Sequence, residues 1–274
     1  MSWLEDVVLG IAQGLTEFLP ISSTAHLRIV PAFAGWDDPG AAFTAVTQLG
    51  TMAAVLLYFR EDLRRIGKAW LRSLRVPAAR RELDARLGWY LVIGTIPIAI
   101  FGLIFRDQIE TGARDLYLIG SALIVLGLVL LLAERVGRRE RGIESLGTRD
   151  GVLIGLAQAL ALVPGVSRSG ATISAGLFAG LRRPDAARFS FLLSVPAVVL
   201  SGLFELLSIL RGKEHYHGSL AGLAVATLLA FVVGYASIAF LLRYLERHST
   251  AVFVAYRVAL GAVVLVLASA GAIG

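Results

Sequence analysis

The stretch Gln13–His26 reads QGLTEFLPISSTAH and sets the architecture, because it places polar groups inside an otherwise apolar segment. A second stretch, Gln158–Thr172, reads QALALVPGVSRSGAT. Sliding the chain by 145 positions aligns the two, so that Ser22 falls on Ser167. The agreement of two polar stretches in two apolar settings indicates an internal repeat.

The charged members of the two copies differ. The first copy supplies Glu17 and His26, whereas the second supplies Arg168. We therefore predict that the copies meet inside a membrane and build one asymmetric site for a phosphorylated lipid.

Composition indicates a membrane protein. The chain has 274 residues, of which 57% are hydrophobic and 17% charged, whereas soluble domains carry about a quarter charged residues. Apolar runs such as Leu116–Ala133 and Ala251–Ala270 are close in length to the roughly 20 residues that span a bilayer. The lack of cysteine excludes disulfides and thiolate metal sites. Glu5 and Asp6 stand where a cleavable signal peptide would carry Lys or Arg, so none is expected.

We predict an all-α integral membrane protein of about six transmembrane helices and two re-entrant helical hairpins, forming one membrane domain over 1–274. The hairpins are expected at 1–34 and about 151–181, broken near Pro20–Thr24 and at Pro164-Gly165. Continuous spans there would leave polar groups at membrane depth, which is costly. Irregular backbone is tolerated at that depth only where protein or a wet cavity covers it. The six spans are expected at about 41–59, 87–105, 116–133, 189–210, 219–242 and 251–273.

The distribution of the +6 net charge predicts topology rather than nucleic-acid binding. Four loops hold 19 of the 26 Lys and Arg residues, and the loops at 106–115 and 211–218 hold four. By the positive-inside rule, the four basic loops are cytoplasmic and both termini lie outside. The basic loops are 60–86, 135–150, 181–188 and 243–250.

The number of spans between the hairpins makes the repeat an inverted one. Three spans separate them, and an odd number brings the second hairpin in from the opposite face. Repeat one then covers about 1–134, a cytoplasmic basic linker about 135–150, and repeat two about 151–274. Inverted repeats with broken helices place their binding sites between the repeats, near the midplane.

Glu17 is a candidate catalytic residue, with Gln13 four positions earlier on the same helical face. Its structural alternative is a protonated carboxyl bonded to a neighbouring helix, but ionisable groups inside membranes usually mark function. As a functional group it could be a general base, a metal ligand or the partner that orients His26. His26 is either a structural histidine or an imidazole that attacks phosphorus or moves a proton.

The hydroxyls of the first loop and the guanidinium of the second suit an anion. Ser and Thr at 22–24 can cap the second half-helix, and with its amides they can also bind an anion. Arg168 presents a planar fork that suits phosphate, the alternative being a salt bridge to Glu17 alone. Arg257, in the last span, needs a partner, either a second phosphate or Glu205. Further donors around Arg168 are Ser167, Ser169 and Thr172.

The motifs at 13–17, 20–26 and 164–172 resemble the signature motifs of the undecaprenyl-diphosphate phosphatase family, the bacitracin-resistance family. The resemblance runs over the whole chain and includes the pair Tyr256-Arg257. It implies a multi-pass enzyme of the bacterial inner membrane, which hydrolyses undecaprenyl diphosphate to the monophosphate and inorganic phosphate and so recycles the carrier lipid for peptidoglycan synthesis. It also implies a divalent cation, Mg²⁺ or Ca²⁺.

Carried over by position, the resemblance implies a catalytic and a binding set of residues. Gln13 stands where the family's first acidic residue would be, so Glu17 would hold the cation together with phosphate oxygens and waters. A second departure is Ala25, which stands where a Gly is more usual. The expected catalytic set is Glu17, Ser23, His26 and Arg168. The expected substrate-binding set is Gln13, Ser22, Thr24, Ser167, Ser169, Thr172 and Arg257.

The expected reaction is phosphoryl transfer from the periplasmic side. Arg168, the loop amides and the cation neutralise the diphosphate. Either Ser23 or His26 attacks the terminal phosphorus, or His26 activates a water that does so. Glu17 serves as the base or as a cation ligand. The rival is a transporter or flippase for polyprenyl phosphates, since inverted repeats and broken helices are transporter architecture. A structural or assembly subunit would leave the buried charges unexplained. The expected partners are the lipid substrate and the bilayer, not nucleic acid, and homo-oligomerisation is left open.

Overall fold

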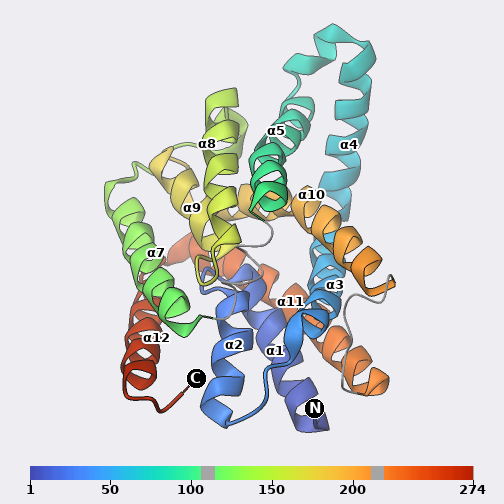
Figure 1. The fold of residues 1–274 in the computed structure, drawn as a ribbon. Coiled ribbons are helices and arrows are strands. Elements are labelled where there is room, and N and C mark those ends of the chain that lie inside the picture. The colour runs from blue at the N-terminus through green and yellow to red at the C-terminus, as the bar shows by residue number, and fades with distance from the viewer. Residues whose placement is uncertain (106–114, 211–218, 274) are drawn as a thin grey trace.

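The computed structural model describes residues 1–105, 115–210 and 219–273, without the side chains of 41, 201 and 203–210. The described residues form helices and no strand (Figure 1). The α-helices are α1 Trp3–Phe18, α2 Ser23–Ala34, α3 Gly40–Tyr58, α4 Arg60–Arg75, α5 Leu83–Ile104, α7 Leu116–Val136, α8 Thr148–Ala159, α9 Arg168–Phe178, α10 Arg183–Leu210, α11 Leu220–Arg247 and α12 Ala251–Ser269. Three short 3-10 helices are η1 Pro77–Arg81, η2 Ile143–Ser145 and η3 Leu160–Leu162.

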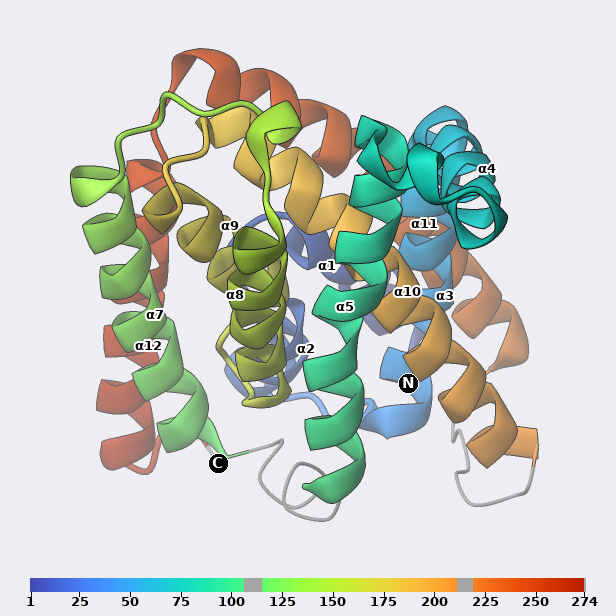
Figure 2. The ribbon, with the colours of Figure 1, turned by 90° about the horizontal axis from the view of Figure 1, so that it is seen from above.

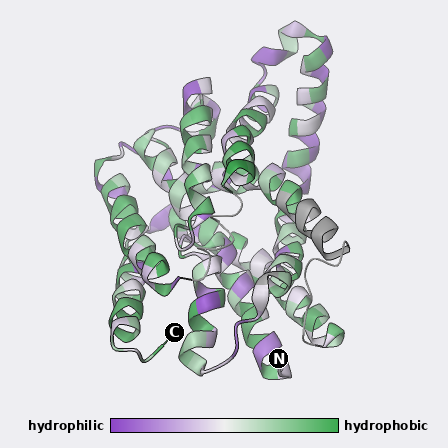
Figure 3. Cartoon of the chain, in the orientation of Figure 1, coloured by the Kyte–Doolittle hydropathy of each residue, from purple (hydrophilic) through white to green (hydrophobic). Residues whose placement is uncertain are grey.

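The helices confirm the prediction of an all-α membrane protein. Among the described residues, α5, α7, α11 and α12 are long and apolar enough to cross a bilayer, and α3 with α4 would make a fifth span. Apolar residues dominate these four helices, whereas hydrophilic residues gather on α4 and in the segment between α7 and α8 (Figure 3). The predicted span at 189–210 falls on α10, whose last turns have side chains outside the described part. The predicted outer loops lie almost wholly outside the described residues.

The predicted loop 60–86 is wrong, because most of it is helical. It contains α4, η1 and the start of α5, and α4 is bent by 74° from α3. Ile66 and Trp70, four positions apart, lie on one face of α4, and the Trp70 ring contacts that of Trp89 in α5 at 5.8 Å. The high density of Arg and Lys predicts a loop, whereas the apolar spacing on this face indicates a helix.

Two helical hairpins interrupt the bundle where the sequence predicts breaks. The first joins α1 to α2 through 19–22, and the second joins α8 through η3 to α9. In both hairpins the outgoing helix begins directly after a serine, Ser22 or Ser167. The polar motifs therefore lie at hairpin tips rather than along continuous helices.

Each hairpin packs on a helix from the other half of the chain. An added Cβ on Gly10 of α1 would lie 2.5 Å from the carbonyl oxygen of Ala226 in α11. A Cβ on Gly155 of α8 would lie 2.4 Å from the Cα of Gly94 in α5. Gly10 and Gly155 align in the repeat, and at both only a hydrogen fits between the helices. The crossed packing brings the two hairpin tips together.

A polar cluster closes one end of the bundle. The buried carboxylate of Glu134 in α7 accepts hydrogen bonds from Arg139 at 2.9 Å, Arg183 at 2.7 Å and the Thr250 hydroxyl at 2.8 Å. These partners come from three of the segments predicted to be cytoplasmic. The cluster ties α7 to the starts of α10 and α12, and so fixes the helices that carry Arg257 and support α9.

Candidate active site

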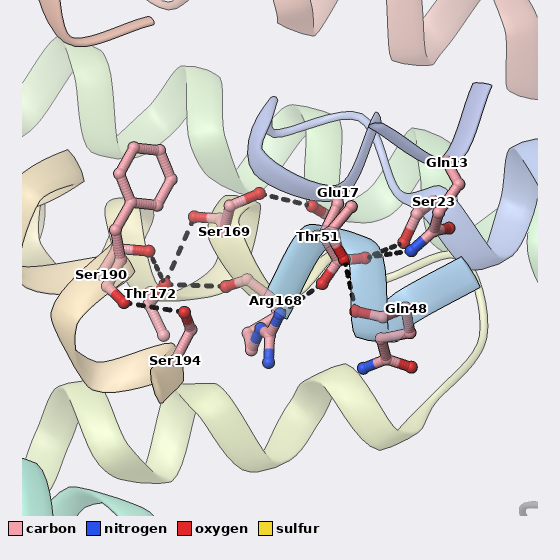
Figure 4. Close-up of polar contacts among 12 residues, drawn as sticks. Gln13, Glu17, Ser23, Gln48, Thr51, Arg168, Ser169, Thr172, Ser190 and Ser194 are labelled. Atoms are coloured by element: carbon pink, nitrogen blue, oxygen red, sulfur yellow. Dashed lines mark hydrogen bonds and ion pairs between the residues drawn. The ribbon is translucent and has the colours of Figure 1, made fainter. Parts of the chain in front are cut away.

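Glu17 lies at the centre of a cluster built from both hairpins (Figure 4). Its Oε2 accepts hydrogen bonds from the Ser23 hydroxyl at 2.6 Å and from Gln13 Nε2 at 3.2 Å. Its Oε1 accepts a hydrogen bond from Nη2 of Arg168 in the second hairpin. The side chains of Glu17 and Arg168 are 9% and 15% exposed, so this ion pair is largely desolvated and strongly held.

Ser22 and Ser167 have the same unusual backbone conformation. Ser22 has φ 76° and ψ 103°, and Ser167 has φ 70° and ψ 114°. Each hydroxyl accepts a hydrogen bond from the amide three residues later, at 3.4 Å from Ala25 and 3.1 Å from Gly170. Residues other than glycine seldom adopt positive φ, and such strain concentrates at functional sites. The matched strained conformations turn the chain sharply at both hairpin tips.

Several predicted binding hydroxyls hold the second loop in place. The Ser169 hydroxyl donates to the carbonyl of Leu19 in the first loop at 3.0 Å. The hydroxyl of Ser167 lies 3.1 Å from that of Ser169. The Thr172 hydroxyl bonds the Arg168 carbonyl at 2.7 Å and the Ser190 hydroxyl at 2.6 Å. These groups are buried, and their contacts position Arg168.

Arg257 joins both hairpin tips to α7. Its guanidinium is fully buried and donates to Pro20 O of the first loop at 3.1 Å. In the second loop it donates to Gly165 O at 3.1 Å and Val166 O at 3.0 Å. Two further bonds reach carbonyls of α7. The partners are therefore carbonyl oxygens; the side chain of Glu205, the predicted alternative, lies outside the described part.

The described hydrogen bonds of His26 go to partners other than Glu17. Its Nδ1 lies 2.7 Å from the carbonyl oxygen of Ser22, and its Nε2 lies 2.7 Å from the hydroxyl of Tyr256. The two rings are nearly parallel, at 8°. Because both ring nitrogens are occupied, His26 would have to lose the contact with Tyr256 before it could react through Nε2.

The structure thus brings some predicted residues together and separates others. Gln13, Glu17, Ser23 and Arg168 meet in one cluster, whereas Thr24 is exposed and its hydroxyl lies 3.1 Å from that of Ser22. The site set from the sequence does not include Tyr256 and the polar residues of two neighbouring helices. The signal for the latter is polar residues spaced three or four apart in apolar helices: Gln48 and Thr51 in α3, and Ser190 and Ser194 in α10 (Figure 4).

The cluster offers oxygen atoms to a hard cation. The side-chain oxygen Oε1 of Gln13 is buried and has no hydrogen-bond partner among the described residues, whereas Nε2 is directed at Glu17. The Glu17 carboxylate accepts the Nε2 hydrogen bond of the same amide and also binds the Ser23 hydroxyl. Mg²⁺ and Ca²⁺ prefer such oxygen ligands. The described residues contain no group of three His, Cys, Asp or Glu side chains that could hold a metal, so phosphate oxygens and waters would complete the coordination.

Fold and site together define a multi-pass helical membrane protein with a buried ion pair and an adjacent hydroxyl at its centre. The chain belongs to the family described as bacitracin resistance protein BacA, whose model matches residues 6–263. It is similar to an undecaprenyl-diphosphatase of a Nocardioides species, with 55% identity over all of this chain and 99% of the relative. The undecaprenyl-diphosphatase of Mycolicibacterium smegmatis is 57% identical over 99% of this chain and 98% of the relative.

Proposed function

We propose that this chain hydrolyses undecaprenyl diphosphate to undecaprenyl phosphate and inorganic phosphate at the Glu17–Ser23–Arg168 cluster. Membership of the family and relatives named for this activity support the reaction. The observation that carries the assignment is the 2.6 Å hydrogen bond from the Ser23 hydroxyl to the Glu17 carboxylate, which Arg168 also contacts. A hydroxyl beside a base and next to a fixed guanidinium is the arrangement that phosphoryl transfer requires.

Ser23 is the nucleophile that this geometry favours over His26 or a water. Its oxygen forms a bond to the terminal phosphorus while its proton passes to Glu17. The bond between that phosphorus and the bridging oxygen breaks, and undecaprenyl phosphate leaves. Glu17 passes the proton to the departing undecaprenyl phosphate and is again a carboxylate. It then takes a proton from a water whose oxygen bonds to phosphorus, the bond from phosphorus to the Ser23 oxygen breaks, and that oxygen takes the proton back from Glu17 as inorganic phosphate is released. Arg168 neutralises the phosphate oxygens throughout, in exchange for part of its contact with Glu17.

His26 acts in this mechanism as a positioning residue. Its contact with the Ser22 carbonyl fixes the peptide that precedes Ser23. Tyr256 holds the ring from the other side, so the imidazole braces the strained tip. This role accounts for a histidine beside the cluster whose described bonds do not reach Glu17.

We further propose a divalent cation at Gln13, Glu17 and Ser23, for which the unpartnered Gln13 Oε1 is the supporting observation. When bound, the ion would neutralise charge on the diphosphate. Gln13 and Glu17 would hold the ion, while the other carboxylate oxygen of Glu17 would keep its hydrogen bond from Arg168. An amide in place of a carboxylate at residue 13 lowers the negative charge of the site, which favours binding of the anionic substrate.

The membrane placement belongs to the same proposal. The basic segments are assigned to the cytoplasm of a bacterial inner membrane, the hairpins are re-entrant, and the site between the repeats opens to the periplasm. Cleavage in intact cells of substrate added from outside supports this placement. Cleavage only after the cytoplasmic leaflet becomes accessible contradicts it.

The contacts between the loops favour an enzyme over a transporter. Alternating access requires the two repeats to move against each other around the site. Arg257 and Ser169 instead bond the two tips to each other and to α7. A locked pair of tips suits catalysis, where the reacting groups must keep their geometry.

Phosphate release from purified protein tests the function. Wild-type protein given undecaprenyl diphosphate with Mg²⁺ should release inorganic phosphate, and Ser23→Ala should release almost none. Acid quenching with labelled terminal phosphate should trap an acid-stable phosphoserine. Ser237→Ala, which removes a buried hydroxyl in α11, is the control and should keep the wild-type rate. Full activity of Ser23→Ala would refute Ser23 as nucleophile, and no release by folded wild-type protein would refute the phosphatase.

A further inference from the structure

A wholly apolar pocket lies next to the second hairpin, outside the polar cluster. Its volume is about 830 Å³, and the described residues that line it are all apolar. Phe101 of α5 and Phe105 directly after its end form one wall. Leu118 of α7 forms another, and Leu160 and Val163 of the hairpin form a third. The pocket therefore has walls from three segments of the chain.

The hairpin creates this pocket because α8 is shorter than its neighbours. Figure 2 shows α8 between α5 and α7 and ending while α5 continues. Beyond Ala159 the chain tightens into η3 and leaves the helix axis. Among the described residues, no helix then lies between the last turns of α5 and the first turn of α7. Their large side chains border a gap that opens outward, where Leu160 is 53% and Phe105 47% exposed.

The pocket and the phosphate cluster share one stretch of chain. Pro164 lines the pocket, and Arg168 begins α9 four residues later. Four residues span at most about 14 Å even when fully extended. A diphosphate held at Arg168 is therefore within reach of the pocket for a chain of a few isoprene units.

We propose that the pocket binds the phosphate-proximal isoprene units of the lipid substrate. The inference rests on the proposed function, which requires an isoprenoid chain to leave a buried polar site. A hydrocarbon chain cannot lie among Glu17, Arg168 and Ser23 without desolvating them, whereas the described side chains that line the pocket are apolar. Burying methyl and methylene groups of the chain against Phe and Leu side chains is favourable. The second hairpin thus binds both parts of the reacting end of the lipid: the phosphate through Arg168 and the adjoining hydrocarbon through 160–164.

A pair of matched substitutions tests the pocket. Leu160→Trp fills it, and Leu132→Trp places the same side chain at an equally exposed position, 53%, near the other end of α7. With the long-chain diphosphate in nanodiscs, Leu160→Trp should raise KM about tenfold, the effect of losing roughly two buried methylene groups. Its kcat/KM for a soluble diphosphate with a single isoprene unit, which is shorter than the few units that reach the pocket from Arg168, should stay at the wild-type value. Leu132→Trp should leave KM and kcat/KM unchanged for both substrates.

Equal effects of Leu160→Trp on both substrates, or no effect on either, would overturn the pocket while leaving the phosphatase intact. A second measurement does not depend on turnover. A polyprenol carrying a diazirine near its hydroxyl end should label peptides that contain 101–105 and 156–164, and Leu160→Trp should reduce that labelling at least several-fold. Labelling spread evenly over lipid-facing helices would overturn the proposal. Failure of the phosphatase itself would instead appear as no phosphate release from either substrate.

Discussion

Glu17 and Arg168 are separated by 151 positions in the chain, yet they form a largely buried ion pair at the contact of the two hairpins. Neither hairpin contains both charges. Removing either residue would leave the other as an uncompensated charge away from water, which is strongly unfavourable. The pair therefore links the folding of the two halves to the chemistry that they share, and a phosphate entering the site would replace part of the pair.

Replacing Arg168 by Lys should separate charge from geometry. The ammonium can still pair with Glu17, so the protein should fold, but it lacks the planar fork that binds two phosphate oxygens. We expect kcat for phosphate release to fall about 10²–10³-fold, with the melting temperature within a few degrees of wild type. A near-normal kcat in Arg168→Lys would show that Arg168 supplies charge alone.

Substitutions at Ser22 should reveal the strain at the hairpin tip. Ser22→Ala keeps the unfavourable positive φ and loses the hydroxyl that caps α2, so it should destabilise by about 1–2 kcal/mol. Ser22→Gly loses the cap but relieves the strain, so its melting temperature should lie above that of Ser22→Ala. Thermal denaturation in detergent measures the difference. Equal melting temperatures would mean that the backbone at 22 is not strained.

Arg257 provides a test of structural against substrate-binding roles. Arg257→Met would leave carbonyl groups of both loops and of α7 without donors, and we expect a loss of about 3–5 kcal/mol. The exposed Arg243→Met in α11 is the control and should change stability by less than about 0.5 kcal/mol. Arg257→Met protein that keeps wild-type stability but binds substrate poorly would instead support the phosphate-binding role predicted from the sequence.

The crossed packing of the hairpins predicts opposite effects of one methyl group at two glycines. Gly155→Ala forces apart α8 and α5, whose backbones are in contact, and should destabilise by about 1–3 kcal/mol. Gly67→Ala in α4 meets no atom within 4 Å and should stabilise by about 0.5–1 kcal/mol through helix propensity. Thermal denaturation of both variants checks the signs. A harmless Gly155→Ala would contradict the close contact with Gly94.

The sequence predicts the helical membrane fold and the two breaks, because charges and prolines in apolar segments are rare and costly. It also selects Glu17 and Arg168 as candidates, and the structure shows that these two residues are in contact. The sequence could not predict the partners of Arg257, since every residue has a carbonyl group and only the fold selects which ones converge. The same limit applies to Tyr256 beside His26. The many cations of α4 predict a loop, whereas the structure has a helix there, with Ile66 and Trp70 on one face.

The most direct test of a site shared by both halves is a double-mutant cycle on phosphate release, with Glu17→Gln, Arg168→Gln and the double variant. Residues of one site act as a unit, so their effects are not additive. We predict that each single change lowers kcat/KM at least about 10²-fold and that the double variant is little worse than either. Effects that multiply, or a single variant that keeps the wild-type rate while folded, would contradict a common site.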